Sequence, residues 1–332
     1  MAYQVNIEPV GKSFKAEADA SVLESAFKAG ITLKHSCRDG QCGECRAPIK
    51  SGAVRYADPD ALSLADSDKA GETGLMCQAL PTGDLTIEAP EVTELDGISV
   101  QKFAGRVMGK EQVSDDVAVL KIGPAPGVEF RFKPGQYVDL TLRGHPSRSY
   151  SMSSLDSDNT IELQVRRMQD GYVSHFIYDE LATKAVVTLE GPFGTFYVRD
   201  SDSPIVFTAS GTGFAPIMGM MRDLIERGNQ RPVVLYWGGR RLKDLYEDAL
   251  CREWADTLDW FSYVPVLSEA AEADQWSGRT GFVHQAVVDD REDLSDVEAY
   301  VCGAPVVVEA ARRDFIGLRG LKPEHFFSDA FV

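Results

Sequence analysis

The chain of 332 residues is poor in basic residues and has no uninterrupted apolar run of membrane length. Its 34 Lys and Arg residues face 51 Asp and Glu residues, which gives a net charge of −17. Nucleic-acid binding needs a basic surface that complements phosphate, so this composition argues against it. The longest uncharged stretch, Ser203–Met221, is interrupted by glycine and proline. We expect a strand, a turn and a helix there rather than a membrane span.

The N-terminus lacks the basic segment and apolar run of a secretory signal, so we expect a cytoplasmic protein. Cysteine is also scarce, with six residues in the whole chain. Nothing in the sequence indicates the oxidising compartment that disulfides need. Four of the six cysteines nevertheless crowd into the first 77 residues. Clustered cysteines in a cytosolic chain more often bind metal.

The four clustered cysteines have a specific spacing. Cys37, Cys42 and Cys45 form a C-x4-C-x2-C run, and Cys77 follows after 31 intervening residues. This is the spacing of plant-type [2Fe–2S] sites. A structural zinc site usually takes two short cysteine pairs, whereas Cys77 stands alone. A Rieske cluster needs two histidines, and since His35 has no second histidine nearby, we expect it to lie on the surface.

The segment around these cysteines, residues 1–95, resembles the plant-type ferredoxin domain in its SCRDGQCGEC and LMCQA stretches. The resemblance implies an α+β fold of the β-grasp type with a [2Fe–2S] cluster on the four cysteines. The residues themselves predict a helix that is capped by Ser21, ends at Gly30 and turns Val22, Ala26 and Ala29 inward. Strands are predicted at 3–9, 13–16 and 84–89, and a linker at 90–99.

Two further domains are predicted downstream. Residues 100–198 combine short apolar strands with Gly and Pro turns, which predicts an antiparallel β-barrel. Residues 203–332 alternate strands with helices, which predicts an α/β domain with a parallel sheet. The barrel strands are expected at 117–122, 136–142, 161–166 and 186–190. The α/β domain is expected to have strands at 205–209, 233–237, 261–266 and 298–302, and helices at 215–227, 243–254, 282–289 and 305–317.

The predicted barrel contains two short motifs, RSYS at 148–151 and GYVS at 171–174. An arginine beside hydroxyls and an aromatic ring is what a flavin's pyrophosphate and ring system use, although RSYS alone also fits an ordinary strand. In this order, the two motifs resemble those of the ferredoxin–NADP⁺ reductase superfamily.

That resemblance implies a bound flavin. It implies that Arg148 contacts the flavin phosphates, that Tyr150 packs on the isoalloxazine ring and that Ser151 lies near flavin N5. Ser149 belongs to the same implied site. Gly171 and Ser174 are implied to hold the pyrophosphate, where a helix N-terminus suits an anion.

A third motif, GTGFAP at 211–216, directly follows the apolar stretch IVFTA. A glycine turn between a buried strand and a helix offers N–H groups to a pyrophosphate, although Pro216 replaces the last glycine of the usual fingerprint. In the reductase superfamily this turn binds the nicotinamide nucleotide, which implies that role for Gly211, Thr212, Gly213 and Pro216. The later Cys302-Gly303 pair resembles the superfamily's CG-x-P motif and implies a cysteine near the nicotinamide C4. Without that context, Cys302 reads as a small buried apolar residue.

Coenzyme choice is left open by the residues. Arg240 and Arg241 follow the strand VVLYW, where a 2′-phosphate or the pyrophosphate would meet them. The resemblance to NADH-linked reductases implies NADH, with NADPH as the alternative. Phe331 near the C-terminus is either the aromatic residue that covers the flavin in the superfamily or a core-packing phenylalanine in a frayed tail.

As a whole, the chain resembles the reductase components of bacterial multicomponent oxygenases. The resemblance implies that a hydride from NADH passes to FAD, and that single electrons then pass through the cluster to an oxygenase or hydroxylase, directly or through a separate ferredoxin. We expect a monomer. A reductase for a CDP-6-deoxyglucoseen-type dehydrase has the same domain order and remains an alternative. So does a protein of another class, a zinc-stabilised binding module.

Overall fold

The computed structural model describes residues 1–90, 92–94 and 97–331. By their contacts these residues form two units. The first contains residues 1–100 together with Phe193–Thr195, and the second contains residues 101–192 and 196–331. We call the barrel residues from 101 that carry RSYS and GYVS the flavin-motif segment, and residues 203–331 the nucleotide-motif segment. Both therefore lie in one unit. The predicted boundaries at 95, 100, 198 and 203 stay predictions.

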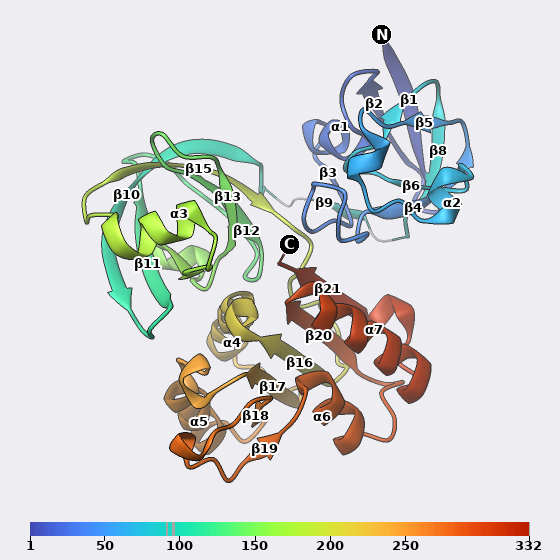
Figure 1. The fold of residues 1–332 in the computed structure, drawn as a ribbon. Helices are drawn as coiled ribbons and strands as arrows, with labels where there is room; N and C mark the ends of the chain where they lie inside the picture. Colours follow the sequence, from blue (N-terminus) through green and yellow to red (C-terminus); the bar gives the residue numbers. More distant parts are fainter. Residues whose placement is uncertain (91, 95–96, 332) are drawn as a thin grey trace. The chain divides into compact units, whose positions relative to one another are not determined.

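The first unit is a small α+β domain. Its five-stranded sheet has the order β2-β1-β8-β4-β6, in which β1 runs antiparallel to β2 and parallel to β8 (Figure 1). Short ladders join β3 to β9 and β5 to β7. The elements are β1 (Ala2–Glu8), β2 (Lys12–Glu17), α1 (Val22–Lys28), β3 (Ile31–Leu33), β4 (Arg46–Ser51), β5 (Val54–Arg55), α2 (Asp66–Lys69), β6 (Thr73–Leu75), β7 (Leu80–Pro81), β8 (Leu85–Glu88) and β9 (Val92–Glu94).

Helix α1 begins and ends where the sequence predicts. The Ser21 hydroxyl accepts a hydrogen bond from the backbone N–H of Glu24 at 3.1 Å, as an N-cap does. Gly30 follows the helix with φ of +73°, a conformation that favours glycine. Val22 and Ala26 are fully buried, but Ala29 is exposed, so its predicted inward orientation is wrong. The helix stops before Ala29 and no longer holds it to the buried face.

The predicted linker at 90–99 lies only partly within the described residues, because 91 and 95–96 fall outside them. Its described part includes a strand, β9, whose backbone pairs antiparallel with β3. The sequence did not show this strand, since a three-residue ladder leaves no alternating pattern.

The flavin-motif segment forms a six-stranded sheet of order β13-β12-β15-β10-β11-β14. An antiparallel bridge between Met152 and Leu163 joins its two edge strands and closes a barrel. The barrel core contains Val107, Leu120 and Val138, all fully buried. The strands are β10 (Gln101–Gln112), β11 (Val117–Pro124), β12 (Tyr137–Thr141), β13 (Arg148–Ser151), β14 (Ile161–Arg166) and β15 (Val186–Phe193). The short helix α3 (Tyr172–His175) continues into a π-helical turn (Phe176–Glu180).

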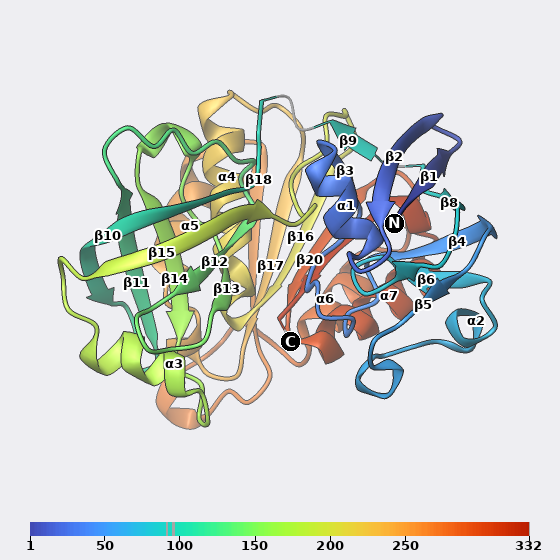
Figure 2. The same ribbon diagram turned by 90° about the horizontal axis from the view of Figure 1, so that it is seen from above.

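The nucleotide-motif segment is a parallel sheet of order β19-β18-β17-β16-β20-β21. Figures 1 and 2 show α4 and α5 on one face and α6 and α7 on the other. The strand order reverses between β16 and β20, and such a switch point is where open α/β sheets bind ligands. The elements are β16 (Ile205–Ser210), α4 (Phe214–Glu226), β17 (Val233–Gly239), α5 (Asp248–Thr257), β18 (Phe261–Leu267), β19 (Arg279–Thr280), α6 (Val283–Asp290), β20 (Glu298–Gly303), α7 (Pro305–Arg319) and β21 (Phe326–Ala330).

Three features of these domains differ from the prediction. Strand β10 was not predicted, because its charged residues interrupt the apolar pattern. The helix expected at 243–254 is a 3₁₀ turn (Leu242–Asp244) followed by α5. A frayed tail, one of the two alternatives for the C-terminus, does not fit β21, whose five residues are all buried. Among the described residues, no helix is both long enough and apolar enough to cross a membrane.

Candidate cluster, flavin and nucleotide sites

The four clustered cysteines come together as two thiol pairs. Cys45 Sγ and Cys77 Sγ lie 3.1 Å apart, and the backbone N–H of Cys42 donates to Cys37 Sγ at 3.4 Å. A hydrogen bond with Cys42, and then burial, raise the pKa of the Cys37 thiol, and the same bond lowers the pKa of Cys42. The loop therefore presents two thiol pairs rather than four separate groups.

This pairing favours one of the metal sites that the spacing allowed. In a [2Fe–2S] cluster two protein ligands bind each iron, whereas a structural zinc ion needs all its ligands around one point. The residues thus fit a binuclear cluster, and the N–H bond to Cys37 is of the kind that stabilises cluster sulfurs.

Close packing shapes the cysteine loop. Gly40 has φ of +84°, a backbone conformation in which any other residue would be strained, and a Cβ there would also press on Leu62 Cδ2 at 2.6 Å. Arg46, directly after Cys45, supports the loop from another side. Its Nε donates to both carboxylate oxygens of Asp68, at 2.9 and 3.1 Å, and its Nη2 donates to the Ser63 carbonyl. Sequence reasoning missed Arg46, because its partners lie more than fifteen positions away.

His35 is buried, with 2% of its surface exposed, so the predicted surface position is wrong. Its Nδ1 donates to the Leu33 carbonyl at 2.7 Å, and its Nε2 accepts from the backbone N–H of Gly194 at 2.8 Å. Burial lowers the pKa of His35 to about 4, so the ring is neutral at neutral pH. Gly194 belongs to the same unit but follows 159 positions later, which is why this partner could not be predicted from the sequence.

The RSYS motif is strand β13 of the barrel. Arg148 is exposed, and its Nη1 donates to the Ser147 carbonyl at 2.8 Å, which leaves its other N–H groups for an anion. Ser149 Oγ donates to Asp139 Oδ1 at 2.7 Å. Tyr150 packs against the barrel core, and burial raises its pKa to about 12. The strand thus presents a surface cation and a half-buried neutral phenol on the same stretch of chain.

Gly171 is the N-cap of α3, as the GYVS motif implied. A Cβ on Gly171 would lie 2.5 Å from Ser174 Oγ, so glycine is needed. The Ser174 hydroxyl accepts from the backbone N–H of Met168 at 3.0 Å and donates to the Gly171 carbonyl at 2.8 Å. Ser174 therefore shapes the turn with its side chain.

Ser151 contacts Asp329, a residue of the nucleotide-motif segment that the sequence did not connect with it. Its hydroxyl donates to Asp329 Oδ2 at 3.3 Å, and both side chains are buried. Asp329 on β21 is the register partner of Cys302 on β20. Burial, and then the Asp329 charge, raise the pKa of Cys302 well above its usual value, so its thiol stays protonated at neutral pH. Sequence reasoning missed Asp329, which only the pairing of β21 with β20 reveals.

The glycine turn Gly211–Gly213 lies between β16 and α4, against the end of β20. Gly211 has φ of +55°, and a Cβ on Gly213 would lie 2.3 Å from the Cys302 carbonyl oxygen. A Cβ on Gly303 would lie 2.1 Å from Ser210 Oγ. The glycine turn and the Cys302–Gly303 motif therefore pack closely against each other at the switch point. Of the other motif residues, Thr212 is half-buried in the turn and Pro216 is buried in the first turn of α4.

Arg166, at the end of barrel strand β14, is a cation that the sequence analysis missed. A Cβ on Gly211 would lie 2.8 Å from Arg166 Nη1, so the guanidinium lies directly against the glycine turn. Arg166 Nε is 3.2 Å from Asp116 Oδ2, but Nε and Nη2 are buried without a well-formed hydrogen bond. An anion at the turn would satisfy this guanidinium.

Acidic residues surround the two arginines that follow β17. Arg241 Nε donates to Asp274 Oδ2 at 2.6 Å, and the backbone N–H groups of Arg240 and Arg241 both donate to Asp244. The N–H of Glu269 donates to the Arg240 carbonyl at 2.9 Å, which places an acidic residue beside the exposed Arg240. The carboxylates come from the segment after β18 and the 3₁₀ turn, so the end of β17 alone could not reveal them.

Phe331 follows β21, and its backbone N–H donates to the Gly303 carbonyl at 2.9 Å. The hydrogen bond anchors Phe331 beside the Cys302–Gly303 motif, and its side chain is 37% exposed. Its implied role over the flavin stays a prediction.

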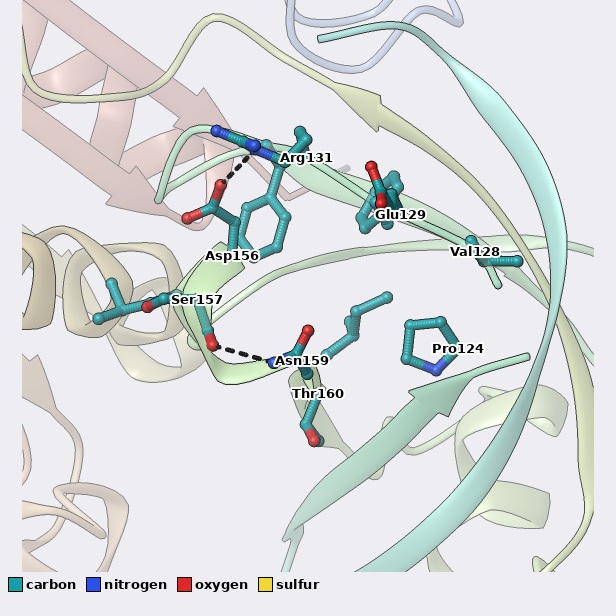
Figure 3. Close-up of a pocket in the computed structure, with 12 residues that line it drawn as sticks. Pro124, Val128, Glu129, Arg131, Asp156, Ser157, Asn159 and Thr160 are labelled. Carbon is teal, nitrogen blue, oxygen red and sulfur yellow. Dashed lines mark hydrogen bonds and ion pairs between the residues drawn. The ribbon is translucent and has the colours of Figure 1, made fainter. Parts of the chain in front are cut away.

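A separate pocket of about 640 Å³ opens at one end of the barrel (Figure 3). Arg131 and Asp156 form an ion pair of 3.1 Å at its edge. The pocket is lined by residues from the end of β11, from 128–132 and from 155–161. None of the predicted flavin or nucleotide residues lines it.

Three family models match the chain in the order of its three motifs. A 2Fe-2S iron-sulfur cluster binding domain matches residues 5–82, an oxidoreductase FAD-binding domain matches 104–197 and an oxidoreductase NAD-binding domain matches 207–313. The matches agree with the cofactors that the thiol pairs, the barrel and the glycine turn fit.

Individual proteins match over nearly the full length. The CDP-6-deoxy-L-threo-D-glycero-4-hexulose-3-dehydrase reductase of Yersinia pseudotuberculosis is 38% identical over 100% of this chain and 99% of its own. The reductase component DmpP of phenol 2-monooxygenase from Pseudomonas sp. CF600 is 34% identical over 94% of this chain and 89% of its own. The crystal structure of the Amycolatopsis cytochrome P450 reductase GcoB superposes with a TM-score of 0.81 at 30% identity, covering 99% of this chain and 98% of GcoB.

Proposed function

Because the chain belongs to the family of NAD(P)H-oxidising reductases that join a 2Fe-2S domain to FAD-binding and NAD-binding domains, we propose that it supplies electrons from NADH to a partner oxygenase or hydroxylase. It is an oxidoreductase with a [2Fe–2S] cluster, FAD and a nicotinamide nucleotide as its redox groups. The observation that carries the proposal is the pairing of the four cysteines in the same chain as a flavin strand and a glycine turn.

When bound, FAD accepts two electrons from the nicotinamide and releases them one at a time to the cluster, which carries a single electron. The protein's own residues bind and orient these groups. Arg148 supports the flavin phosphates through charge-assisted hydrogen bonds, and Tyr150 supports the flavin ring from the barrel side. Arg166 supports the pyrophosphate of the nicotinamide nucleotide at the glycine turn.

Ser151, Cys302 and Asp329 form the polar floor of the site where the nicotinamide meets the flavin. The neutral thiol of Cys302 excludes water without adding a charge, because burial and Asp329 keep it protonated. Asp329 accepts the hydrogen bond of Ser151 and so orients the hydroxyl. Of these three side chains, Asp329 is charged, while the Ser151 hydroxyl and the Cys302 thiol are neutral.

NADH is the coenzyme that the site supports best. The carboxylates of Asp244, Glu269 and Asp274 all act on Arg241, and Asp274 binds its side chain directly. A 2′-phosphate would have to displace the Asp274 contact and approach the other carboxylates. The hydroxyl of NADH meets no such repulsion.

A reconstitution tests the proposed electron path. The holoprotein is titrated with NADH without oxygen, and both the flavin and cluster absorption bands should bleach. The reduced protein is then mixed with a purified oxygenase or hydroxylase component, and substrate-dependent NADH oxidation should follow. A wild-type protein that bleaches neither band would overturn the proposal.

A second partner class is favoured by a specific observation. The relative named as a CDP-hexulose dehydrase reductase is 38% identical, against 34% for the phenol monooxygenase component. The same reduced protein should therefore also be mixed with a deoxysugar dehydrase. Turnover with the dehydrase and none with oxygenase components would assign this partner instead. That the protein is monomeric, cytoplasmic and able to act through a separate ferredoxin is part of the proposal, and gel filtration and fractionation test the first two points.

A further inference from the structure

A buried tryptophan is hydrogen-bonded to the glycine turn of the nucleotide motif. Trp237 on β17 is fully buried, and its indole Nε1 donates to the Gly211 carbonyl at 3.0 Å. The same carbonyl accepts the backbone N–H of Phe214, the first residue of α4. Both lone pairs of the Gly211 oxygen are thus occupied.

The indole is itself held in place by two aromatic rings. It stacks on Phe214 with ring centroids 4.0 Å apart and an interplanar angle of 15°. Tyr246 meets it edge-on, at 5.2 Å and 89°. The Tyr246 hydroxyl donates to Gln164 Oε1 at 2.6 Å, and Gln164 lies on barrel strand β14. The indole therefore has little freedom to leave the Gly211 carbonyl.

The conformation of Gly211 makes this hydrogen bond consequential. Glycine at φ of +55° has many other conformations open to it, so the turn depends on its contacts to stay in one. In the first turn of α4, Phe214 already donates its N–H to the Gly211 carbonyl and Pro216 has no N–H. A phosphate here therefore depends on the N–H groups of the turn itself. Arg166 lies against the same glycine. A fixed carbonyl on one side of the turn therefore fixes the donors on its other side.

We propose that Trp237 is a positioning residue for the nicotinamide nucleotide, and that its indole N–H preorganises the Gly211–Gly213 turn for the pyrophosphate. The inference rests on the proposed function, since it assumes that this turn receives NADH. The hydrogen bond and ring contacts of Trp237 go to Gly211, Phe214 and Tyr246, which lie outside the flavin motif and the Ser151–Asp329 pair. Loss of Trp237 should weaken nucleotide binding without changing the hydride-transfer step itself.

The test is Trp237→Phe, which keeps an aromatic ring against Phe214 and removes the N–H. With ferricyanide as acceptor, the KM for NADH should rise about tenfold, equivalent to about 1.4 kcal/mol, while kcat stays within about twofold. FAD and iron content should equal those of the wild type. The matched control is Trp254→Phe, another buried tryptophan in the same core whose ring meets Phe261 and not the turn. The control should leave the KM unchanged.

A second variant removes the concern that phenylalanine leaves a cavity. Benzothienylalanine at position 237 has the shape of tryptophan with sulfur in place of the N–H, so the packing is kept and only the donor is lost. The same rise in KM is expected. An unchanged KM in this variant overturns the inference, as does an equal rise in Trp254→Phe or a fall in kcat at constant KM. If the wild type itself fails to oxidise NADH, the proposed function fails. If the wild type oxidises NADH and the benzothienylalanine variant keeps the same KM, only the inference about Trp237 fails.

Discussion

The hydroxyl of Ser151 donates to Asp329 Oδ2 at 3.3 Å, across 178 positions of sequence. Ser151 ends a barrel strand, and Asp329 lies on the last strand of the parallel sheet, opposite Cys302. The hydrogen bond therefore joins the flavin motif to the nucleotide motif through a residue that belongs to neither. The carboxylate at this point orients a hydroxyl, and after burial it is the second cause that raises the pKa of the neighbouring Cys302 thiol.

Removal of the Asp329 carboxylate should slow flavin reduction. We expect Asp329→Ala to lower the rate of flavin bleaching by NADH about tenfold, because the Ser151 hydroxyl loses its acceptor, worth about 1.4 kcal/mol. Asp329→Asn keeps an acceptor oxygen and should retain most of the rate. Anaerobic stopped-flow measurement of the flavin absorbance gives both rates. Equal rates in all three proteins would show that the hydrogen bond does not affect the reaction.

The cluster and the flavin should be separable. Cys42→Ser removes one ligand of the cluster and should abolish its spectrum, while FAD binding, which uses a different domain, should persist. NADH should still reduce the flavin and ferricyanide, but cytochrome c reduction, which draws on the cluster, should fall sharply. Cys251→Ser is the control, because Cys251 is buried in the nucleotide-domain core. A complete [2Fe–2S] spectrum in Cys42→Ser would falsify the ligand assignment.

Loss of the Arg148 guanidinium should release FAD. A charge-assisted bond to phosphate is roughly twice as strong as a neutral one, so Arg148→Ala should lose most of its flavin on gel filtration and keep its iron. Arg143 is a nearby exposed arginine outside the motif, and Arg143→Ala should keep FAD. If Arg148→Ala emerges with the wild-type ratio of FAD to protein, another group holds the phosphates.

Coenzyme choice should follow the carboxylates around Arg241. We expect kcat/KM for NADH to exceed that for NADPH about tenfold, equivalent to about 1.4 kcal/mol. Asp274→Asn removes the charge that binds Arg241. It should therefore lower the ratio of kcat/KM for NADH to kcat/KM for NADPH, because the guanidinium can then bind a 2′-phosphate. Asp256→Asn, an exposed carboxylate on α5, is the control. A wild-type preference for NADPH would show that Arg240 and Arg241 bind the 2′-phosphate despite their acidic neighbours.

The sequence by itself determined the domain types and the cofactor motifs of this protein. Cysteine spacing, the RSYS strand and the glycine turn are local patterns, in which a few adjacent residues must adopt one conformation around one group. Patterns of this kind can be recognised from the sequence. The same is true of strands and helices whose apolar residues recur regularly, such as β16 and α4. Capping at Ser21 was predictable for the same reason, since the cap and its partner Glu24 are three positions apart.

Only the tertiary structure decided which distant side chains meet. The burial of His35, the Arg46–Asp68 pair, Arg166 against Gly211 and Asp329 beside Ser151 all depend on partners far along the chain. The same holds for the arginines that follow β17, because Asp274, which lies after β18, binds Arg241. A hydrogen bond or ion pair depends on the distance between two groups in space. Sheet pairing and barrel closure bring together residues that are far apart in sequence, so the sequence alone does not indicate which of them meet.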